Sequence, residues 1–211
     1  MILHSAWRAS APYRVRIALN LKGLPYDYAP VDLMAGQQKS AQYRALNAQG
    51  LVPALEVDGH VLTQSLSIIE WLEETHPQPP LLPNSALERA TVRTMVGVIA
   101  CDIHPVNNLR ILRALSALGI DEDGRNDWAR RWIAEGFDAL EPMLARHGGG
   151  WSFGDTPTMA DCCLVPQVYN ARRFGVDLSP YPAISSVAEA ADAHPAFAAA
   201  HPNRQPDALD A

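Results

Sequence analysis

A serine stands where the chain leaves its first predicted strand and enters a helix. Ser10 lies three residues before an amphipathic stretch from Tyr13 to Lys22, which Gly23 ends. The free backbone N–H groups and the dipole of a helix start stabilise an anion such as a thiolate. The hydroxyl of Ser10 can therefore donate to the thiolate of a bound molecule, or it can simply cap the helix. Dithiol redox chemistry is not expected, because no cysteine occupies this turn.

Two further segments offer backbone or hydroxyl groups to a ligand. Val52-Pro53 precedes a predicted strand. A cis peptide bond there would expose the N–H and C=O of Val52, whereas a trans bond would make an ordinary turn. Gln64 and Ser65 begin another predicted helix, where backbone amides suit a carboxylate and where Ser65 can act as the cap.

Polar residues later in the chain could complete such a site. His104 and Asn108 lie four positions apart in a predicted helix and so share a face, as ligands or as an ordinary polar patch. Arg173 ends another predicted helix, and Arg110 is long enough to reach around its own helix. Arginine binds carboxylates in a two-pronged manner, although a charged helix end is often only solvated.

The composition limits the partners. The 211 residues include 17 basic and 23 acidic side chains, a net charge of −6, which opposes binding to nucleic acid or an acidic membrane. Charged residues interrupt every apolar run, so no membrane span is expected. The three cysteines lack zinc-site spacing and predict reduced thiols in a cytoplasmic protein without a metal. An acidic ligand would have to be bound by local charges.

The first 80 residues predict a small domain that mixes strands and helices. Hydrophobic periodicity and turn residues, with Asp58-Gly59 as a hairpin turn, set its elements. The expected strands are 1–4, 26–31, 54–57 and 61–63, and the expected helices are 13–22, 37–46 and 65–75. The order βαβαββα is that of a thioredoxin-like domain.

A proline-rich segment, 77–83, separates this domain from an all-helical one at residues 81–211. Helical periodicity covers 87–117, 127–146, 159–174 and 183–200. Pro105 predicts a kink near His104. Thr158 and Asp161 have the spacing of a capping box.

Taken together, these segments resemble the zeta class of glutathione transferases over nearly the whole chain. The specific matches include Arg14 to Leu19, Asp102-Ile103-His104-Pro105 and Leu164-Val165-Pro166-Gln167-Val168. The resemblance implies the glutathione transferase fold. One departure is clear, because Ala9-Ser10-Ala11 replaces the Ser-Ser-Cys signature of the class. This loss argues against a mechanism that needs a thiol of the protein.

The resemblance also implies roles for individual residues. Catalysis would rest on Ser10, Arg8 and Arg173, and the substrate would be bound by Arg8, Arg110 and Arg173. Glutathione, the expected cofactor, would contact Ser10, Ala11, Gln38, Val52, Gln64, Ser65, His104, Asn108 and Arg110.

The implied reaction is the cis–trans isomerisation of a small maleyl dicarboxylate, as in the conversion of maleylacetoacetate to fumarylacetoacetate during tyrosine and phenylalanine breakdown. Glutathione would add to the double bond, allow rotation and leave. Isomerisation of maleylpyruvate in gentisate catabolism is the nearest alternative. A transferase acting on haloacids and a noncatalytic glutathione-binding module are the others. The resemblance further implies a homodimer.

Overall fold

The computed structural model describes residues 1 to 208, which fall into two compact units. The first unit comprises Met1–Leu81 together with the described residues from Asp192 onward, and the second comprises Leu82–Ala191. The structure thus differs from the predicted split in one respect, since the end of the chain groups with the amino-terminal unit.

A four-stranded mixed sheet forms the centre of the first unit. Its strands are β1 (Ile2–Ser5), β2 (Asp27–Pro30), β3 (Ala54–Val57) and β4 (His60–Thr63). Their order is β2-β1-β3-β4, with β1 parallel to β2 and the other pairs antiparallel. Asp58 and Gly59 both adopt positive φ in the hairpin turn, as the sequence predicts. The predicted order βαβαββα is confirmed.

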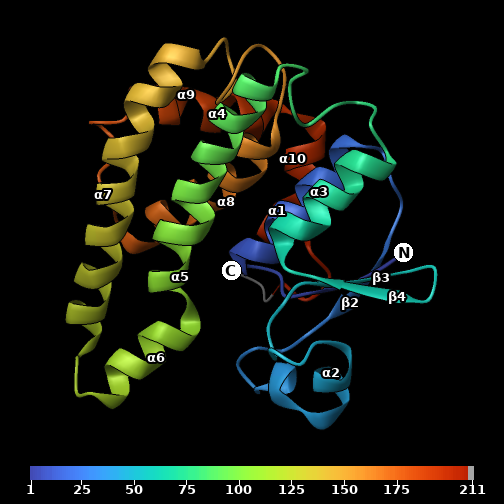
Figure 1. The fold of residues 1–211 in the computed structure, drawn as a ribbon. Helices are drawn as coiled ribbons and strands as arrows, with labels where there is room; N and C mark the ends of the chain where they lie inside the picture. Colours follow the sequence, from blue (N-terminus) through green and yellow to red (C-terminus); the bar gives the residue numbers. More distant parts are fainter. Residues whose placement is uncertain (209–211) are drawn as a thin grey trace. The chain divides into compact units, whose positions relative to one another are not determined.

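Helices cover both faces of this sheet. The helices are α1 (Ser10–Leu21), α2 (Ala41–Leu46), which follows a 3-10 turn at Gln37–Lys39, and α3 (Ser65–Thr75). Figure 1 shows α1 and α3 on one face and α2 on the other. Apolar side chains from the sheet and from α1 and α3 are fully buried between them and form the core: Leu3, Ile17, Leu19, Leu55, Ile68, Ile69 and Leu72.

The carboxyl-terminal segment joins the first unit through α10 (Pro195–Ala200). Two side chains of α1 donate to carbonyl oxygens of α10: Arg16 Nε to Ala200 at 3.0 Å and Asn20 Nδ2 to Ala196 at 3.0 Å. Arg16 is fully buried, so its guanidinium must find acceptors inside the protein. This requirement explains why the segment belongs with residues 1–81.

The proline-rich segment after α3 is held by one buried lysine. Lys22 Nζ donates to Glu73 Oε2 at 2.9 Å and to the carbonyls of His76 at 2.6 Å and Pro79 at 3.0 Å. Glu73 Oε2 also accepts from the N–H of Leu81 at 2.9 Å. The segment is therefore fixed to the first unit and is not a loose linker.

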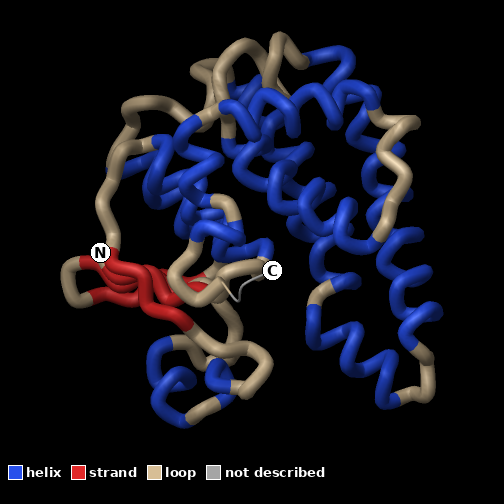
Figure 2. The backbone as a smooth tube through the Cα atoms, turned by 180° about the vertical axis from the view of Figure 1, so that it is seen from behind, coloured by secondary structure: helices blue, strands red, loops and turns tan. Residues whose placement is uncertain are grey.

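The second unit is helical. It contains α4 (Ala86–Gly97), a π-helical segment (Val98–Ile103), α5 (His104–Asn107), α6 (Leu109–Ala117), α7 (Glu122–His147), α8 (Met159–Phe174) and most of α9 (Pro182–Ala193). Within residues 82–191 the only strand-like pairing is one bridge, between Gly148 and Gly154, and Figure 2 shows helices and loops alone. None of the helices in the described part of the chain is both long enough and apolar enough to cross a membrane.

The predicted helix 87–117 is broken in two places. The π-helical segment ends two residues before Pro105, which lies in the first turn of α5 and cannot donate a backbone hydrogen bond. The second break is Asn108, whose backbone is extended (ψ 164°) and whose Oδ1 accepts from the N–H groups of Arg110 and Ile111. The irregularity expected near His104 is thus larger than a kink.

Helix α8 is the buried centre of the second unit, beside α4 and α7. Its predicted capping box is confirmed. Asp161, fully buried, accepts from the N–H of Thr158 at 2.7 Å, from its hydroxyl at 2.9 Å and from the N–H of Ser152 at 2.8 Å.

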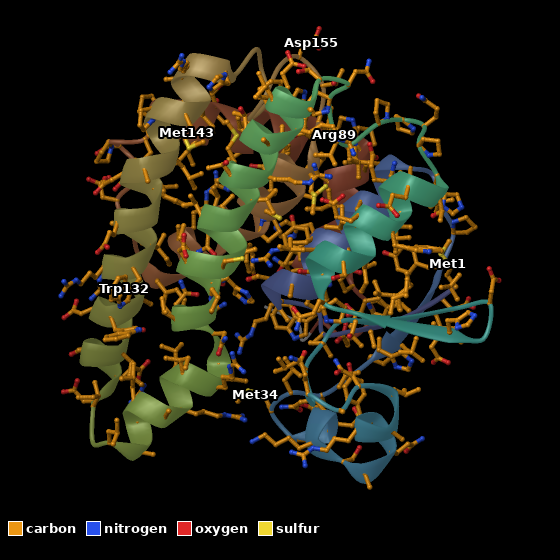
Figure 3. The ribbon with its side chains drawn as sticks, viewed as in Figure 1. Met1, Met34, Arg89, Trp132, Met143 and Asp155 are labelled. Carbon is orange, nitrogen blue, oxygen red and sulfur yellow. The ribbon has the colours of Figure 1, made fainter. Side chains whose placement is uncertain are left out.

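On α7, Trp132 (Figure 3) packs edge-on against Trp128 with ring centres 5.6 Å apart.

Replacing Asp161 with alanine should lower the free energy of unfolding by about 2–4 kcal/mol, because three buried donors lose their acceptor. Urea unfolding followed by circular dichroism measures this change. Asp155→Ala is the matched control, since Asp155 is exposed in the preceding loop (Figure 3). Equal losses in the two variants would contradict the prediction.

Candidate functional site

The turn before α1 presents Ser10 at the first helical position. Ala9 occupies the N-cap with extended backbone (φ −73°, ψ 129°), and an alanine side chain cannot cap. The alternative that Ser10 is the N-cap residue is therefore wrong. Ser10 is 6% exposed, and Ala11 follows it in the same first turn, where backbone N–H groups lack helical acceptors. This environment favours a bound anion.

Arg8 lies beside this turn and is exposed. Its guanidinium carbon lies 5.3 Å from the ring centre of Trp7, a cation–π arrangement. The backbone of Trp7 is itself fixed on both sides, by Asp207 at its N–H (3.1 Å) and by Arg16 at its carbonyl (2.8 Å). Arg8 and Ser10 thus belong to one anchored turn.

Gln38 is a buried amide with an open acceptor. It is 6% exposed in the 3-10 turn before α2, and its Oε1 has no hydrogen-bond partner among residues 1 to 208. The neighbouring Gly50 has φ +62°, and a Cβ there would lie 2.9 Å from the carbonyl oxygen of Gln38. Only glycine permits this approach, which brings the loop before β3 against Gln38.

That loop carries Val52. The Val52–Pro53 peptide bond is cis, one of the two alternatives that the sequence leaves open. The preceding carbonyl, of Leu51, accepts from Tyr43 Oη at 2.8 Å and from Asn47 Nδ2 at 2.7 Å. Burial raises the pKa of Tyr43 to about 12, so its phenol remains a donor at neutral pH. The side chains of Tyr43, on α2, and of Asn47, the C-cap residue of α2, therefore position the backbone next to Val52.

At the start of α3 the predicted roles of two residues change. Gln64, with φ 66° and ψ 117°, occupies the N-cap, and Ser65 is the first helical residue, so the prediction that Ser65 is the cap is wrong. Ser65 Oγ accepts from Arg14 Nη1 at 3.2 Å, and Gln64 Nε2 donates to Gln49 Oε1 at 2.6 Å. Positive φ is uncommon in a residue other than glycine or asparagine.

In the second unit, the prediction that His104 and Asn108 share one helical face is wrong. His104 begins α5, whereas Asn108 lies between α5 and α6. The side chain of Asn108 caps α6 and donates to the carbonyl of Pro105 at 3.0 Å. Arg110 donates its N–H to this cap, and its side chain is exposed in the first turn of α6. The break at Asn108 separates the two residues onto different elements.

Arg173, near the end of α8, has a defined orientation although it is exposed. Its Nη1 donates to Asn170 Oδ1 at 2.9 Å, and its guanidinium carbon lies 4.9 Å from the ring centre of Phe174. Helix α8 ends at Gly175 with φ 70°, and Arg130 of α7 donates to the last carbonyl, of Phe174, at 3.1 Å. The guanidinium is therefore held, which reduces the entropy lost when it binds a carboxylate.

The predicted site residues are distributed over the two units. The first unit contains Arg8, Ser10, Ala11, Gln38, Val52, Gln64 and Ser65, and the second contains His104, Asn108, Arg110 and Arg173. The convergence of Arg8, Arg110 and Arg173 stays a prediction. Across residues 1 to 208, His, Cys, Asp and Glu side chains form no group of three that could hold a metal ion.

Comparisons with known proteins identify the family of the chain. The model of the glutathione S-transferase N-terminal domain matches residues 10–75, and that of the C-terminal domain matches residues 110–200. The chain belongs to the glutathione S-transferase family, and its relatives place it in the zeta class.

Among curated relatives, a maleylpyruvate isomerase from Ralstonia sp is 51% identical over 98% of this chain and 99% of that protein. A probable maleylacetoacetate isomerase 2 from Drosophila melanogaster is 48% identical over 98% of this chain and 89% of that protein. This chain is similar to both over nearly its full length.

Three solved structures are similar as well. A holo maleylpyruvate isomerase of the zeta class is 51% identical (TM-score 0.97, covering 99% of this chain and 100% of that chain). A maleylacetoacetate isomerase from Methylobacterium extorquens AM1 with malonate and glutathione is 39% identical (TM-score 0.95, 100% of both chains). One from Anaeromyxobacter dehalogenans 2CP-1, with dicarboxyethyl glutathione and citrate in its active site, is 47% identical (TM-score 0.89, 99% and 97%).

Sequence reasoning missed the residues that hold the site residues in place. Arg16, Asn47 and Asn170 are charged or polar residues within or at the ends of predicted helices, and their burial is the signal that only the fold provides. Asp207 gave no signal at all, because it contacts a residue 200 positions away.

Replacing Gly50 with alanine should cost about 1–3 kcal/mol more stability than replacing Gly59. Both glycines have positive φ, so both variants carry similar backbone strain, but a Cβ at Gly59 has no heavy atom within 4 Å. Thermal unfolding of the two variants measures the difference. Equal stabilities would show that the contact with Gln38 does not require glycine.

Proposed function

We propose that the chain is a glutathione-dependent cis–trans isomerase that converts maleylacetoacetate to fumarylacetoacetate. The observation that carries this proposal is the anchored turn with Ser10 at the start of α1, in a chain that matches isomerases of this kind over nearly its full length. The first unit is proposed to bind glutathione and the second to complete the substrate site.

The described residues of the first unit fit glutathione. The buried Oε1 of Gln38 has no partner among residues 1 to 208. It is therefore suited to accept a hydrogen bond from a donor group near the glycyl end of glutathione. Val52 offers its backbone beside a cis proline for the cysteinyl part. Gln64, Ser65 and the start of α3 suit the γ-glutamyl carboxylate. In the second unit, His104 and Asn108 are proposed as further contacts.

When bound, glutathione supplies a thiolate that adds to the cis double bond, allows rotation about the former double bond, and is eliminated. Ser10 is proposed to donate its hydroxyl proton in a hydrogen bond to that sulfur, with the amides of the first turn of α1, including that of Ala11, lowering the cost of its charge. No cysteine lies in this turn, so the turn itself contributes no thiol. The relative that contains dicarboxyethyl glutathione supports addition of this type.

Arg8, Arg110 and Arg173 are proposed to bind the carboxylates of the substrate and the negative charge that develops during addition. A protein of net charge −6 has no overall attraction for a dicarboxylate, so these local cations must provide it. The ring contacts of Arg8 with Trp7 and of Arg173 with Phe174 support preset orientations. Bound malonate and citrate in the relatives are consistent with an acidic substrate.

Maleylpyruvate is the second candidate substrate, because the chain is 51% identical to a maleylpyruvate isomerase over nearly its whole length. The chemistry and the cationic groups required are the same, and only the chain length of the substrate differs.

We also propose that the protein works as a cytoplasmic homodimer. The three free cysteines support a reducing compartment, and the zeta-class resemblance supports the dimer.

Assays of the purified protein with glutathione should show turnover of both maleyl substrates, with a higher kcat/KM for maleylacetoacetate. An equal or reversed preference would contradict the assignment of the substrate. Halide release from a 2-haloacid with consumption of glutathione, and no turnover of maleyl compounds, would instead identify a conjugating transferase.

Ser10→Ala should lower kcat/KM by about 10- to 100-fold, because the charged thiolate loses the hydrogen bond that the Ser10 hydroxyl donates.

Arg173→Ala should raise KM for the maleyl substrate by about tenfold, because a carboxylate loses its cation. Ser186→Ala on α9 and Arg172→Ala on α8 are matched controls at exposed positions. Isomerase activity that survives both changes would contradict the assigned roles, and a parent that binds glutathione without turnover would indicate a noncatalytic module.

A further inference from the structure

The peptide groups of Trp7 are held by two charged side chains from different parts of the chain. Its N–H donates to Asp207 Oδ2 at 3.1 Å, and its carbonyl accepts from Arg16 Nη2 at 2.8 Å. Arg16 belongs to α1, whereas Asp207 follows the 3-10 turn Pro202–Arg204 near the end of the described chain. The two contacts fix both polar atoms of the Trp7 backbone.

The second oxygen of Asp207 is also used. Tyr28, on β2, donates its hydroxyl to Asp207 Oδ1 at 2.6 Å. Burial and this hydrogen bond raise the pKa of Tyr28, so the phenol keeps its proton and remains a donor. One carboxylate therefore links the sheet to the turn that precedes α1.

The position of Trp7 in turn determines that of the proposed site residues. The guanidinium of Arg8 lies over the Trp7 ring, and the turn is closed by a hydrogen bond from the N–H of Ala9 to the carbonyl of Ala6 at 3.0 Å. Ser10 follows directly as the first residue of α1. A displacement of Trp7 would move a proposed substrate cation and the start of the proposed thiolate site together.

We propose that Asp207 is a positioning residue for the isomerisation, acting through Trp7 on Arg8 and Ser10. The inference rests on the proposed function of that turn. Asp207 touches neither reactant; it holds the peptide that carries Arg8, with Tyr28 orienting its carboxylate and Arg16 holding the opposite side of the same residue.

Three variants of the full chain test this proposal. Asp207→Ala removes both acceptors. Asp207→Asn keeps the shape of the side chain and an oxygen that accepts from the Trp7 N–H, and its amide N–H can donate to the hydroxyl oxygen of Tyr28. Tyr28→Phe removes only the group that orients the carboxylate. Asn203→Ala is the matched control, because the side chain of Asn203 is exposed in the same segment.

For Asp207→Ala we expect kcat/KM for isomerisation to fall about tenfold, in line with the loss of a charge-assisted hydrogen bond. The thiol of bound glutathione, followed by the ultraviolet absorbance of the thiolate, should ionise at a higher pH than in the parent. Measured at a pH well below the pKa of the bound thiol, where parent and variant both bind the neutral thiol, the Kd for glutathione should stay within about twofold, because Gln38, Gln64 and Ser65 are unchanged. Asp207→Asn should restore most of the activity, and Tyr28→Phe should lose severalfold.

A folded Asp207→Ala variant with the kinetics and thiol ionisation of Asn203→Ala would overturn the proposal. A loss of activity that equals the loss of folded protein, with the ionisation of the bound thiol unchanged, would also overturn it. If Asp207→Ala does not fold, full activity in Tyr28→Phe would overturn it, and a severalfold loss with an altered thiol ionisation would support it. A parent that neither binds glutathione nor isomerises a maleyl compound would contradict the proposed function itself.

Discussion

The first unit depends on the buried cation of Arg16. The guanidinium of Arg16 has no exposure and donates to Ser5 Oγ at 3.0 Å, to the carbonyl of Trp7 and to the carbonyl of Ala200. Burial lowers the pKa of Arg16, yet an arginine keeps its charge inside proteins, so each donor needs an acceptor. Satisfying them joins the end of β1, the turn before α1 and the end of α10. The same requirement therefore organises the fold and fixes the position of the site.

A common pattern runs through the candidate site. Several of the residues proposed to touch glutathione or substrate are held by a neighbour whose own role is structural. Tyr43 and Asn47 hold the carbonyl before Val52, and Asn170 holds Arg173. Functional groups placed in this way lose little entropy on binding, which is the physical basis of preorganisation. Loss of the Ser-Ser-Cys signature leaves this supporting frame intact, because the frame uses other residues.

Three of the predictions that the structure corrects concern helix ends. Ser10 and Ser65 are the residue types that cap helices, but each lies one position inside its helix, after Ala9 and Gln64. Asn108, predicted to lie within a helix, caps the next one. A one-residue shift is invisible to periodicity, because a cap is defined by backbone dihedral angles that the surrounding chain imposes. At Asn108 the side chain accepts hydrogen bonds from nearby backbone N–H groups, and this local bonding interrupts the helix.

The sequence by itself determined the strand and helix order of residues 1–75, the helical character of the second unit, the capping box at Asp161 and the family resemblance. These features rest on local patterns, namely apolar period, turn residues and short motifs. The tertiary structure alone decided the cis form of Val52–Pro53, the close approach of Gly50 to Gln38, and the return of Asp207 to Trp7. Such contacts depend on where distant segments pack to satisfy buried polar groups, and no local pattern encodes a partner 200 positions away.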